Sequence, residues 1–201
     1  MSFEYRFVPG RRSDVVLVTL HGTGGTENDL IEIGDIVAMG WPILSPRGNV
    51  QENGHGRFFR RFAEGVFDED SMREQTDLLS LFLREKFSEL IGEDVRAYGL
   101  GYSNGANMAA CLALLHPGTL QGACLWRAGF PIQPEVKPAL NGFRGLAISG
   151  KFDSIVPPED AKALTEYMNG CGANAEWSAI DAGHGLTRTD IDMAQRFFDS
   201  I

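Results

Sequence analysis

The chain has 201 residues, a length typical of a single domain with a full-sized hydrophobic core. Its formal net charge of −9 argues against a nucleic-acid partner, because a phosphate backbone would repel it. No segment approaches 18 consecutive apolar residues, and the N-terminus lacks the apolar stretch of a signal peptide. We therefore expect one cytoplasmic domain over residues 1–201, a monomer or homodimer that binds neither nucleic acid nor membranes.

The chain contains three cysteines, Cys111, Cys124 and Cys171. Their number is odd, and Cys111 and Cys124 lie in apolar runs that are typical of buried elements. Free cysteines in such runs usually serve as small hydrophobic residues of the core, not as disulfide partners or metal ligands. This pattern fits a reducing compartment, and we expect no metal site.

Stretches typical of strands alternate with stretches typical of helices from residue 15 onward. Strands are expected at an edge segment, 3–8, and then at 15–20, 41–44, 95–100, 120–126, 143–149 and 175–180. Helices are expected at 27–38, 72–91, 106–116, 159–169 and 187–198. A long connection rich in Gly, Arg and Phe occupies 46–70. This order predicts an α/β fold, a mostly parallel sheet covered by helices on both faces.

Three residues with catalytic side chains each follow a different predicted strand. They are Ser103, Asp153 and His184. In an open parallel sheet the ligand site lies at the carboxyl ends of the strands. We therefore expect these residues, far apart in the sequence, to meet at one edge of the sheet.

Residues 101–105, Gly-Tyr-Ser-Asn-Gly, stand between a predicted strand and a predicted helix. A Gly-x-Ser-x-Gly sequence in this setting is typical of a nucleophile elbow, a sharp turn that exposes the serine hydroxyl. Its glycines remove the collisions that larger side chains would have around the strained serine. The turn also places the serine at a helix N-terminus, where free N–H groups stabilise negative charge. Ser103 is therefore the predicted nucleophile.

Two glycine-rich patterns resemble nucleotide-binding turns but lack a required residue. Gly99-Leu100-Gly101 opens like a dinucleotide-binding fingerprint, which needs a third glycine where this chain has Asn104. The loop 21–25, His-Gly-Thr-Gly-Gly, lacks the Gly-Lys-Ser/Thr ending of a phosphate-binding loop. A plain turn between a strand and a helix is the alternative interpretation of each segment.

A serine hydroxyl needs a base within hydrogen-bond reach, and the chain has four histidines. His184 lies in a glycine-flanked loop after the last predicted strand. It is the candidate base, because triads built on such an elbow run in the order serine, acid, histidine. His116 is expected to cap a helix end, His55 to lie exposed in a loop, and His21 to brace the loop that it begins.

The candidate acid is Asp153, which directly follows a predicted strand. A carboxylate at this point would hold the tautomer of His184 and stabilise its charged form. An Asx turn or a helix cap is the alternative role for Asp153. Asp181 is the rival acid, but it ends the same strand that leads to the histidine.

An acyl-transfer site also needs donors for the oxyanion of the tetrahedral intermediate. The backbone N–H of Asn104, directly after the nucleophile, is one candidate. The second is expected from the glycine-rich loop 21–25, with the N–H of Thr23 as the first choice and that of Gly24 as the second.

The connection at 46–70 contains many aromatic and arginine residues. A pocket wall and partial lid over the serine could be formed by the aromatics of this segment, Phe58, Phe59, Phe62 and Phe67. Arg60 is a further candidate pocket residue. The alternative is a loop that aromatics anchor to the core, with arginines solvated or paired to local acids. Arg60 or Arg61 could bind a substrate carboxylate. Two residues outside this segment, Arg127 and Ile155, complete the candidate pocket.

With these motifs in place, the chain resembles the α/β-hydrolase superfamily, and within it the phospholipase/carboxylesterase branch without a large cap domain. The segments Ser-Pro-Arg-Gly-Asn at 45–49, Arg-Phe-Phe-Arg-Arg at 57–61 and Gly-Val-Phe-Asp at 65–68 are similar to bacterial MhqD-like hydrolases, a group linked to hydroquinones and catechols. The resemblance implies Ser103 as nucleophile, Asp153 as acid and His184 as base. The segment 126–131, Trp-Arg-Ala-Gly-Phe-Pro, departs from that group.

The predicted function is a serine hydrolase, a carboxylesterase that cleaves small carboxylic esters through an acyl-enzyme on Ser103. It requires neither a metal nor an organic cofactor. Alternatives with the same triad are a thioesterase, a lysophospholipase or a dienelactone-type hydrolase. An alternative of another class is a catalytically slow sensor or binding protein on the same fold, for which an intact triad would be unnecessary.

Overall fold

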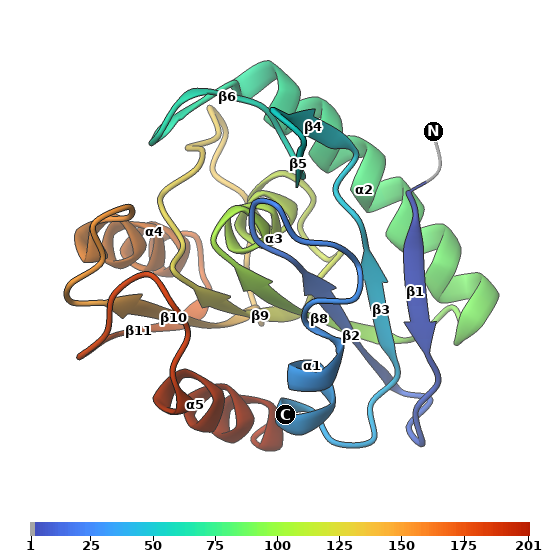
Figure 1. Ribbon diagram of the computed structural model, residues 1–201. Helices are drawn as coiled ribbons and strands as arrows, with labels where there is room; N and C mark the ends of the chain where they lie inside the picture. Colours follow the sequence, from blue (N-terminus) through green and yellow to red (C-terminus); the bar gives the residue numbers. More distant parts are fainter. Residues whose placement is uncertain (1–2) are drawn as a thin grey trace.

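A seven-stranded sheet runs through this computed structural model, which describes residues 3–201 (Figure 1). Its strands in chain order are β1 (Tyr5–Val8), β2 (Val15–Leu20), β3 (Ile43–Pro46), β8 (Arg96–Tyr102), β9 (Gly122–Trp126), β10 (Arg144–Gly150) and β11 (Asn174–Ile180). In space their order is β1-β3-β2-β8-β9-β10-β11. Only β1 pairs antiparallel among these strands, which confirms both the edge position of the first strand and the mostly parallel sheet.

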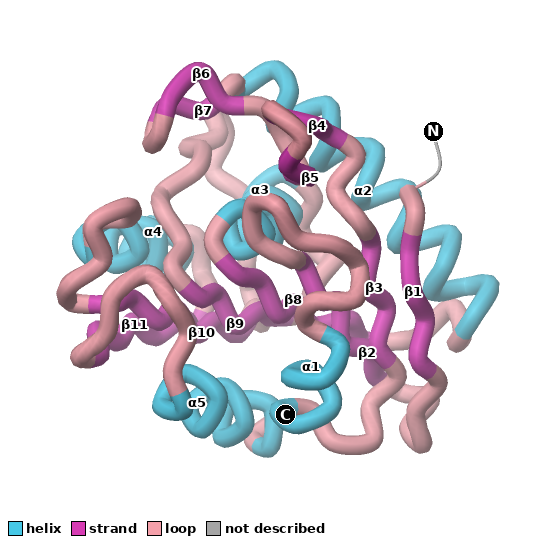
Figure 2. The backbone as a smooth tube through the Cα atoms, viewed as in Figure 1, coloured by secondary structure: helices cyan, strands magenta, loops and turns pink. Residues whose placement is uncertain are grey.

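Five helices cover the two faces of the sheet in the described part of the chain. They are α1 (Ile31–Val37), α2 (Glu69–Leu90), α3 (Asn104–Leu115), α4 (Pro158–Gly170) and α5 (Arg188–Asp199). Helices α2, α3 and α4 pack on one face and share one hydrophobic cluster with it, while α1 and α5 cover the other (Figures 1 and 2). No helix within residues 3–201 is long and apolar enough to cross a membrane.

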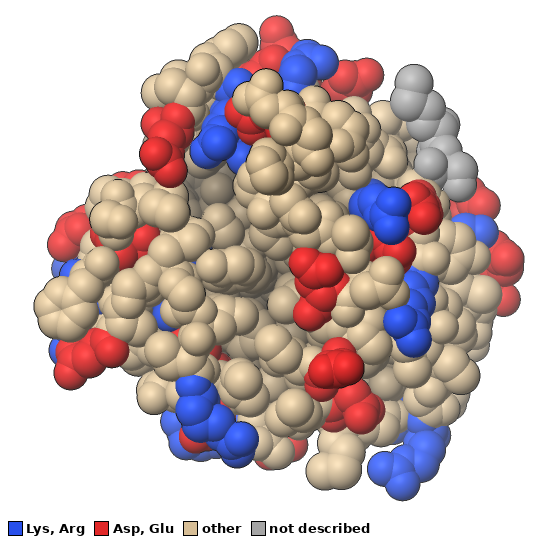
Figure 3. All heavy atoms as spheres, viewed as in Figure 1, with Lys and Arg blue, Asp and Glu red and all other residues tan. Residues whose placement is uncertain are grey.

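Two small hairpins interrupt the segment expected as a plain connection. They are β4 (Val50–Glu52) with β5 (His55–Arg57), and β6 (Arg61–Ala63) with β7 (Val66–Phe67). Both stand above the carboxyl ends of the central strands (Figure 2), and the surface is hollowed beneath them (Figure 3). The first turn is Asn53-Gly54, with φ of 51° and 82° at its two residues. This backbone matches the twist of a two-residue hairpin, which explains the sequence Asn-Gly.

Two helices begin three or more residues away from their expected first residues. The helix expected at 27–38 begins only at Ile31, because residues before it form turns held by the side chains of Thr26 and Asp29. Helix α2 begins earlier than expected, at Glu69. The carboxylate of Asp68 caps it by accepting the N–H of Ser71 at 3.0 Å, which satisfies one of the free donors of the first turn.

Candidate active site

Ser103 lies in a strained turn between β8 and α3. Its φ of 53° and ψ of −112° are outside the regions that side chains with a Cβ readily adopt. The glycines of the motif are required by close packing. A Cβ at Gly101 would lie 2.6 Å from the Cα of Ala106, and one at Gly105 would lie 2.0 Å from the carbonyl oxygen of Leu20. The sequence therefore forms the sharp turn that a nucleophile elbow requires.

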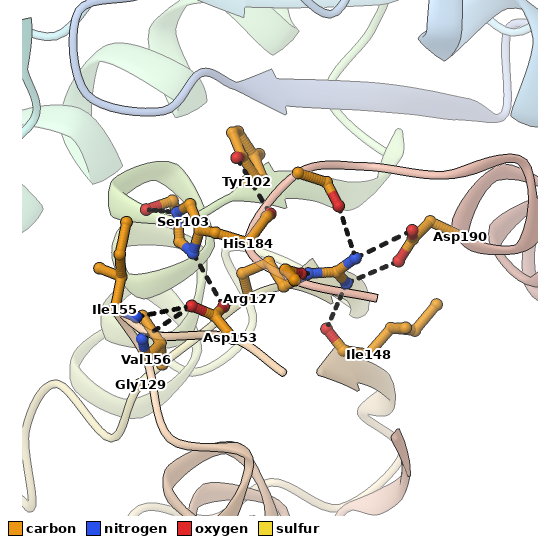
Figure 4. A network of polar contacts seen from close by, with 12 residues as sticks. Tyr102, Ser103, Arg127, Gly129, Ile148, Asp153, Ile155, Val156, His184 and Asp190 are labelled. Atoms are coloured by element: carbon orange, nitrogen blue, oxygen red, sulfur yellow. Dashed lines mark hydrogen bonds and ion pairs between the residues drawn. The ribbon is translucent and has the colours of Figure 1, made fainter. Parts of the chain in front are cut away.

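Three side chains from three loops form a hydrogen-bonded chain at this edge of the sheet (Figure 4). The Nε2 atom of His184 lies 3.1 Å from the Oγ atom of Ser103. The Nδ1 atom of His184 lies 2.8 Å from the Oδ2 atom of Asp153. With the proton on Nδ1 donated to the carboxylate, Nε2 is free to accept the serine proton. The structure thus brings together the three residues that the sequence singled out.

The carboxylate of Asp153 is fixed by the loop that follows β10. Its Oδ1 atom accepts the N–H groups of Ile155 and Val156 at 2.8 and 3.0 Å. Burial by itself would raise the pKa of Asp153, but these two N–H groups and His184 outweigh it and hold the pKa below its usual range. The rival Asp181 is exposed and pairs with Lys151 at 2.7 Å.

Two backbone N–H groups belong to residues that line the same cavity as Ser103 and are candidate oxyanion donors. Those of Thr23 and Asn104 have no hydrogen-bond partner within residues 3–201, and both residues line the cavity at Ser103. The second choice, Gly24, donates its N–H to the carbonyl of Gly56 at 2.9 Å and is therefore occupied. Thr23 and Asn104 remain the proposed pair.

The loop that carries Thr23 is braced by His21, as its sequence position predicted. The Nδ1–H of His21 donates to the carbonyl of Gly22 at 2.7 Å, and Nε2 accepts the N–H of Gly48 at 3.0 Å. Burial lowers the pKa of His21, although the hydrogen bond to Gly22 opposes that shift. The neutral tautomer is therefore the one that both contacts require.

A cavity of about 370 Å³ opens beside Ser103. Its walls come from the loops after β2, β9 and β10, from the two hairpins, and from the starts of α2, α3 and α4. The lining residues are Thr23, Arg57, Arg61, Glu64, Gly65, Val66, Phe67, Glu69, Ser103, Asn104, Asn107, Gly129, Phe130, Pro131, Ile155, Val156, Pro157 and Asp160. The volume lies at the lower end of the range for small-molecule sites.

Three candidate pocket residues of the segment 46–70 lie outside this cavity wall. Phe58 and Phe59 are fully buried, and Phe58 packs on the ring of His21 with centroids 4.8 Å apart. Arg60 points to solvent and pairs with Asp68 at 2.9 Å. The prediction was wrong for Phe58 and Phe59 because their rings pack into the core, whereas Phe67 of the same segment does line the cavity and Phe62 is exposed.

Arg127 also lies outside the cavity wall, although it was a candidate pocket residue. Its side chain is fully buried and forms an ion pair with Asp190 at 2.6 Å. Its other N–H groups donate to the backbone carbonyls of Ile148 (Figure 4), Gly183 and Gly185. Of the candidate pocket residues, Ile155 does line the cavity, directly beside Asp153.

The sequence interpretation did not select Arg57, although it contacts a candidate oxyanion residue. Its side chain is 2% exposed, and its Nη1 atom donates to the Oγ1 atom of Thr23 at 2.7 Å. Burial lowers the pKa of Arg57, and nearby Arg61 adds to this effect, while Glu52 opposes it. The Arg-Phe-Phe-Arg-Arg segment was the available signal, but the sequence does not show which arginine faces inward.

The remaining histidines and the cysteines lie where the sequence placed them. His116, at the end of α3, pairs with Asp77 at 2.7 Å, and His55 is exposed. The three cysteines are free and buried, and burial raises the pKa of Cys111 and Cys124. Among the residues that the structure describes, no group of three His, Cys, Asp or Glu side chains could hold a metal ion.

Known proteins resemble the chain over nearly its whole length, although no protein-family model matches it. The chain is 37% identical over 186 residues to "Putative hydrolase MhqD" of Bacillus subtilis (strain 168), covering 92% of this chain and 93% of that protein. A solved carboxylesterase of Bacillus cereus gives a TM-score of 0.95 at 36% identity, with 98% of this chain and 94% of that chain covered. A carboxylesterase from Mesorhizobium loti gives a TM-score of 0.89 at 30% identity, covering 99% and 95%. These matches confirm the expected α/β-hydrolase fold.

Proposed function

Because this chain belongs to the MhqD-like family of α/β-hydrolases and is a carboxylic ester hydrolase, we propose that it cleaves small esters through an acyl-enzyme on Ser103. One observation carries the proposal. The Oγ atom of Ser103 lies 3.1 Å from the Nε2 atom of His184, whose other ring nitrogen contacts Asp153. This is the arrangement that activates a serine hydroxyl for attack on a carbonyl.

Acylation begins when the ester carbonyl lies against the hydroxyl of Ser103. Nε2 of His184 removes the serine proton while Oγ bonds to the carbonyl carbon, and the carbonyl π electrons move onto oxygen. The N–H groups of Thr23 and Asn104 stabilise this oxyanion. The intermediate then collapses: the carbonyl re-forms, the bond to the alcohol oxygen breaks, and protonated His184 gives its proton to the leaving alcohol.

Deacylation repeats these steps with water. His184 removes a proton from water, and the resulting hydroxide oxygen attacks the acyl carbon of the Ser103 ester. The second tetrahedral intermediate releases the carboxylic acid, and the serine oxygen regains a proton from His184. The enzyme returns to its starting state, with Asp153 charged throughout. The depressed pKa of Asp153 supports this role, because the carboxylate then stays ionised beside the imidazolium.

A fluorophosphonate probe combined with hydrolysis of a short-chain aryl ester tests the proposal. We expect the probe to label the protein covalently and Ser103→Ala to abolish labelling, because Oγ is the attacking atom. His184→Ala should fold normally and lose nearly all turnover. The matched control is Ser88→Ala, which removes an exposed hydroxyl on α2 and should label like the parent protein. Labelling that persists in Ser103→Ala would show that another residue is the nucleophile.

A further inference from the structure

Three consecutive backbone carbonyls around His184 each accept a hydrogen bond from a buried or half-buried side chain. The Nε–H of Arg127 donates to the carbonyl of Gly183, and its Nη2 group donates to that of Gly185, both at 2.9 Å. Between them, the hydroxyl of Tyr102 donates to the carbonyl of His184 at 3.1 Å. The loop is therefore held on both sides of the histidine and at the histidine itself (Figure 4).

Arg127 uses all five of its N–H donors in this arrangement. Besides the two loop carbonyls, its guanidinium donates to the carbonyl of Ile148 at 3.2 Å and to both carboxylate oxygens of Asp190 at 2.6 and 3.0 Å. Asp190 also accepts the N–H of Thr187 and so forms the capping box of α5. One guanidinium thus ties the histidine loop to strand β10 and to the start of α5.

The stability of the fold does not by itself explain why Arg127 and Asp190 form an ion pair in the interior. The side chains of Arg127 and Asp190 are both 0% exposed. Apolar residues of similar volume often stabilise a core as well as a buried pair or better, because removing two charges from water costs free energy. Arg127 also has a φ of 57°, an unfavourable backbone angle for a residue with a side chain. Within this pair, Arg127 contacts the loop 183–185, which carries the candidate base His184.

We propose that Arg127 and Tyr102 are positioning residues, which hold the loop 183–185 so that the imidazole of His184 stays between Ser103 and Asp153. This inference rests on the proposed function, because it assigns a role relative to the base. The loop itself supplies little rigidity, since glycine stands on either side of the histidine and permits many backbone conformations. The hydrogen bonds from Arg127 and Tyr102 therefore restrict backbone conformations that the local sequence would allow.

Tyr102 links the hydrogen-bonded loop 183–185 directly to the nucleophile. It precedes Ser103 in the chain, and its ring lies beside that of His184, with centroids 5.4 Å apart. The same side chain therefore fixes the base relative to the elbow through its ring and through its hydroxyl. Burial raises the pKa of Tyr102, so the hydroxyl remains protonated and able to donate.

The test uses two conservative variants of the full-length protein. Arg127→Lys keeps a positive charge beside Asp190 but offers three donors from a single atom, which cannot reach both loop carbonyls in the geometry of the guanidinium. Tyr102→Phe keeps the ring and removes only the hydroxyl. We expect kcat to fall about 100-fold in Arg127→Lys and about 10-fold in Tyr102→Phe, with KM changed less than about twofold, because misplacement by about 1 Å can slow catalysis about 100-fold.

Matched controls separate positioning from general loosening of the fold. Arg144→Lys removes a guanidinium that donates twice to Ser200, at the other end of α5. Tyr98→Phe removes a hydroxyl from the same strand as Tyr102, at a buried ring that packs on Trp41. Both controls should retain kcat within about twofold. Urea unfolding of all four variants reports whether each one folds.

The decisive measurement repeats both variants in a His184→Ala background. If Arg127 and Tyr102 act only through His184, substituting them in this background should not lower the residual kcat any further. If His184→Ala itself keeps full activity, the proposed function fails. Suppose instead that His184→Ala is inactive, and that Tyr102→Phe folds and keeps the parent kcat. The positioning role is then wrong, and this conclusion does not depend on whether Arg127→Lys folds. A further loss in the His184→Ala background would assign these residues a general structural role instead.

Discussion

The two carboxylate oxygens of Asp153 face different partners. Oδ1 accepts the backbone N–H groups of Ile155 and Val156, while Oδ2 faces Nδ1 of His184. Asp153→Asn should keep the backbone contacts through its carbonyl oxygen and turn its NH2 group toward the ring. The imidazole would then hold its proton on the wrong nitrogen. We expect kcat for ester hydrolysis to fall about 10⁴-fold, as measured by steady-state kinetics.

Asp181→Asn is the matched control for this change. Asp181 directly follows β11, the strand that leads to His184, but its carboxylate is exposed and pairs with Lys151. An exposed ion pair contributes little to the free energy of unfolding, so Asp181→Asn should fold and hydrolyse esters at the parent rate. The opposite result, with Asp181→Asn inactive and Asp153→Asn active, would transfer the role of the acid to Asp181.

Sequence patterns predicted the three side chains that meet at the edge of the sheet, but only some of the residues around them. Ser103, Asp153 and His184 follow strand ends, and a parallel sheet places those ends together whatever the loops do in detail. The direction of a long side chain in a loop depends on tertiary packing instead. For that reason Arg127 was assigned to the pocket, although it faces the histidine loop, and Arg57 was passed over in favour of the exposed Arg60.

At the scale of elements, the loop after β2 depends on a neutral histidine. His21 accepts the N–H of Gly48 through Nε2, a contact that protonation would remove. Its charged neighbours are Glu27 and Asp29, which favour the protonated ring, and Arg47, which opposes it. Burial has the largest effect, and the pKa of His21 in the folded protein lies below the ordinary value of about 6.5.

The sign of the pH dependence follows from linkage. Well above pH 6.5 the ring is neutral in both the folded and unfolded chains, and the contribution of His21 to stability is fully present. As the pH falls below that value, the unfolded chain binds the proton first, and the free energy of unfolding decreases until the folded pKa is passed. Urea unfolding between pH 7.5 and 5 should show this loss.

The variant His21→Gln should have a smaller loss of stability over the same pH interval, because it has no group to protonate there. The exposed His55 offers a control, and His55→Gln should follow the parent curve. Equal slopes in His21→Gln and the parent protein would show that other groups cause the acid sensitivity.

The elements of the sheet were predictable because long apolar runs alternate with amphipathic stretches. The six residues of β2 are all buried, and all except Thr19 are apolar, which is typical of a central parallel strand. The hairpins were missed because β4 to β7 have at most three residues each, too few for a periodic pattern. The Asn53-Gly54 turn was the available signal, since Asn-Gly strongly favours a two-residue hairpin.

At the scale of the whole molecule, the cavity is built by segments that meet only in the folded chain. The hairpin β6–β7 contributes Val66, helix α3 contributes Asn107, and the loop after β9 contributes Phe130. Charges of both signs, among them Arg61 and Asp160, also lie in its walls. Burial and nearby Glu159 raise the pKa of Asp160. The cavity walls therefore combine apolar side chains with polar and charged groups.

The size of this cavity predicts a limit on the acyl chain. Phe130 lines it and packs its ring on Tyr167, with centroids 5.5 Å apart. Phe130→Ala should extend the cavity toward Tyr167 and shift the acyl-chain length with the highest kcat/KM to longer esters. Each methylene that gains burial contributes about 0.8 kcal/mol, which corresponds to roughly fourfold in kcat/KM.

A series of aryl esters with increasing acyl length measures the shift. The control is Phe62→Ala, which truncates a ring that is 77% exposed. An unchanged length profile in Phe130→Ala would place the acyl group elsewhere in the cavity, against the hairpin β6–β7.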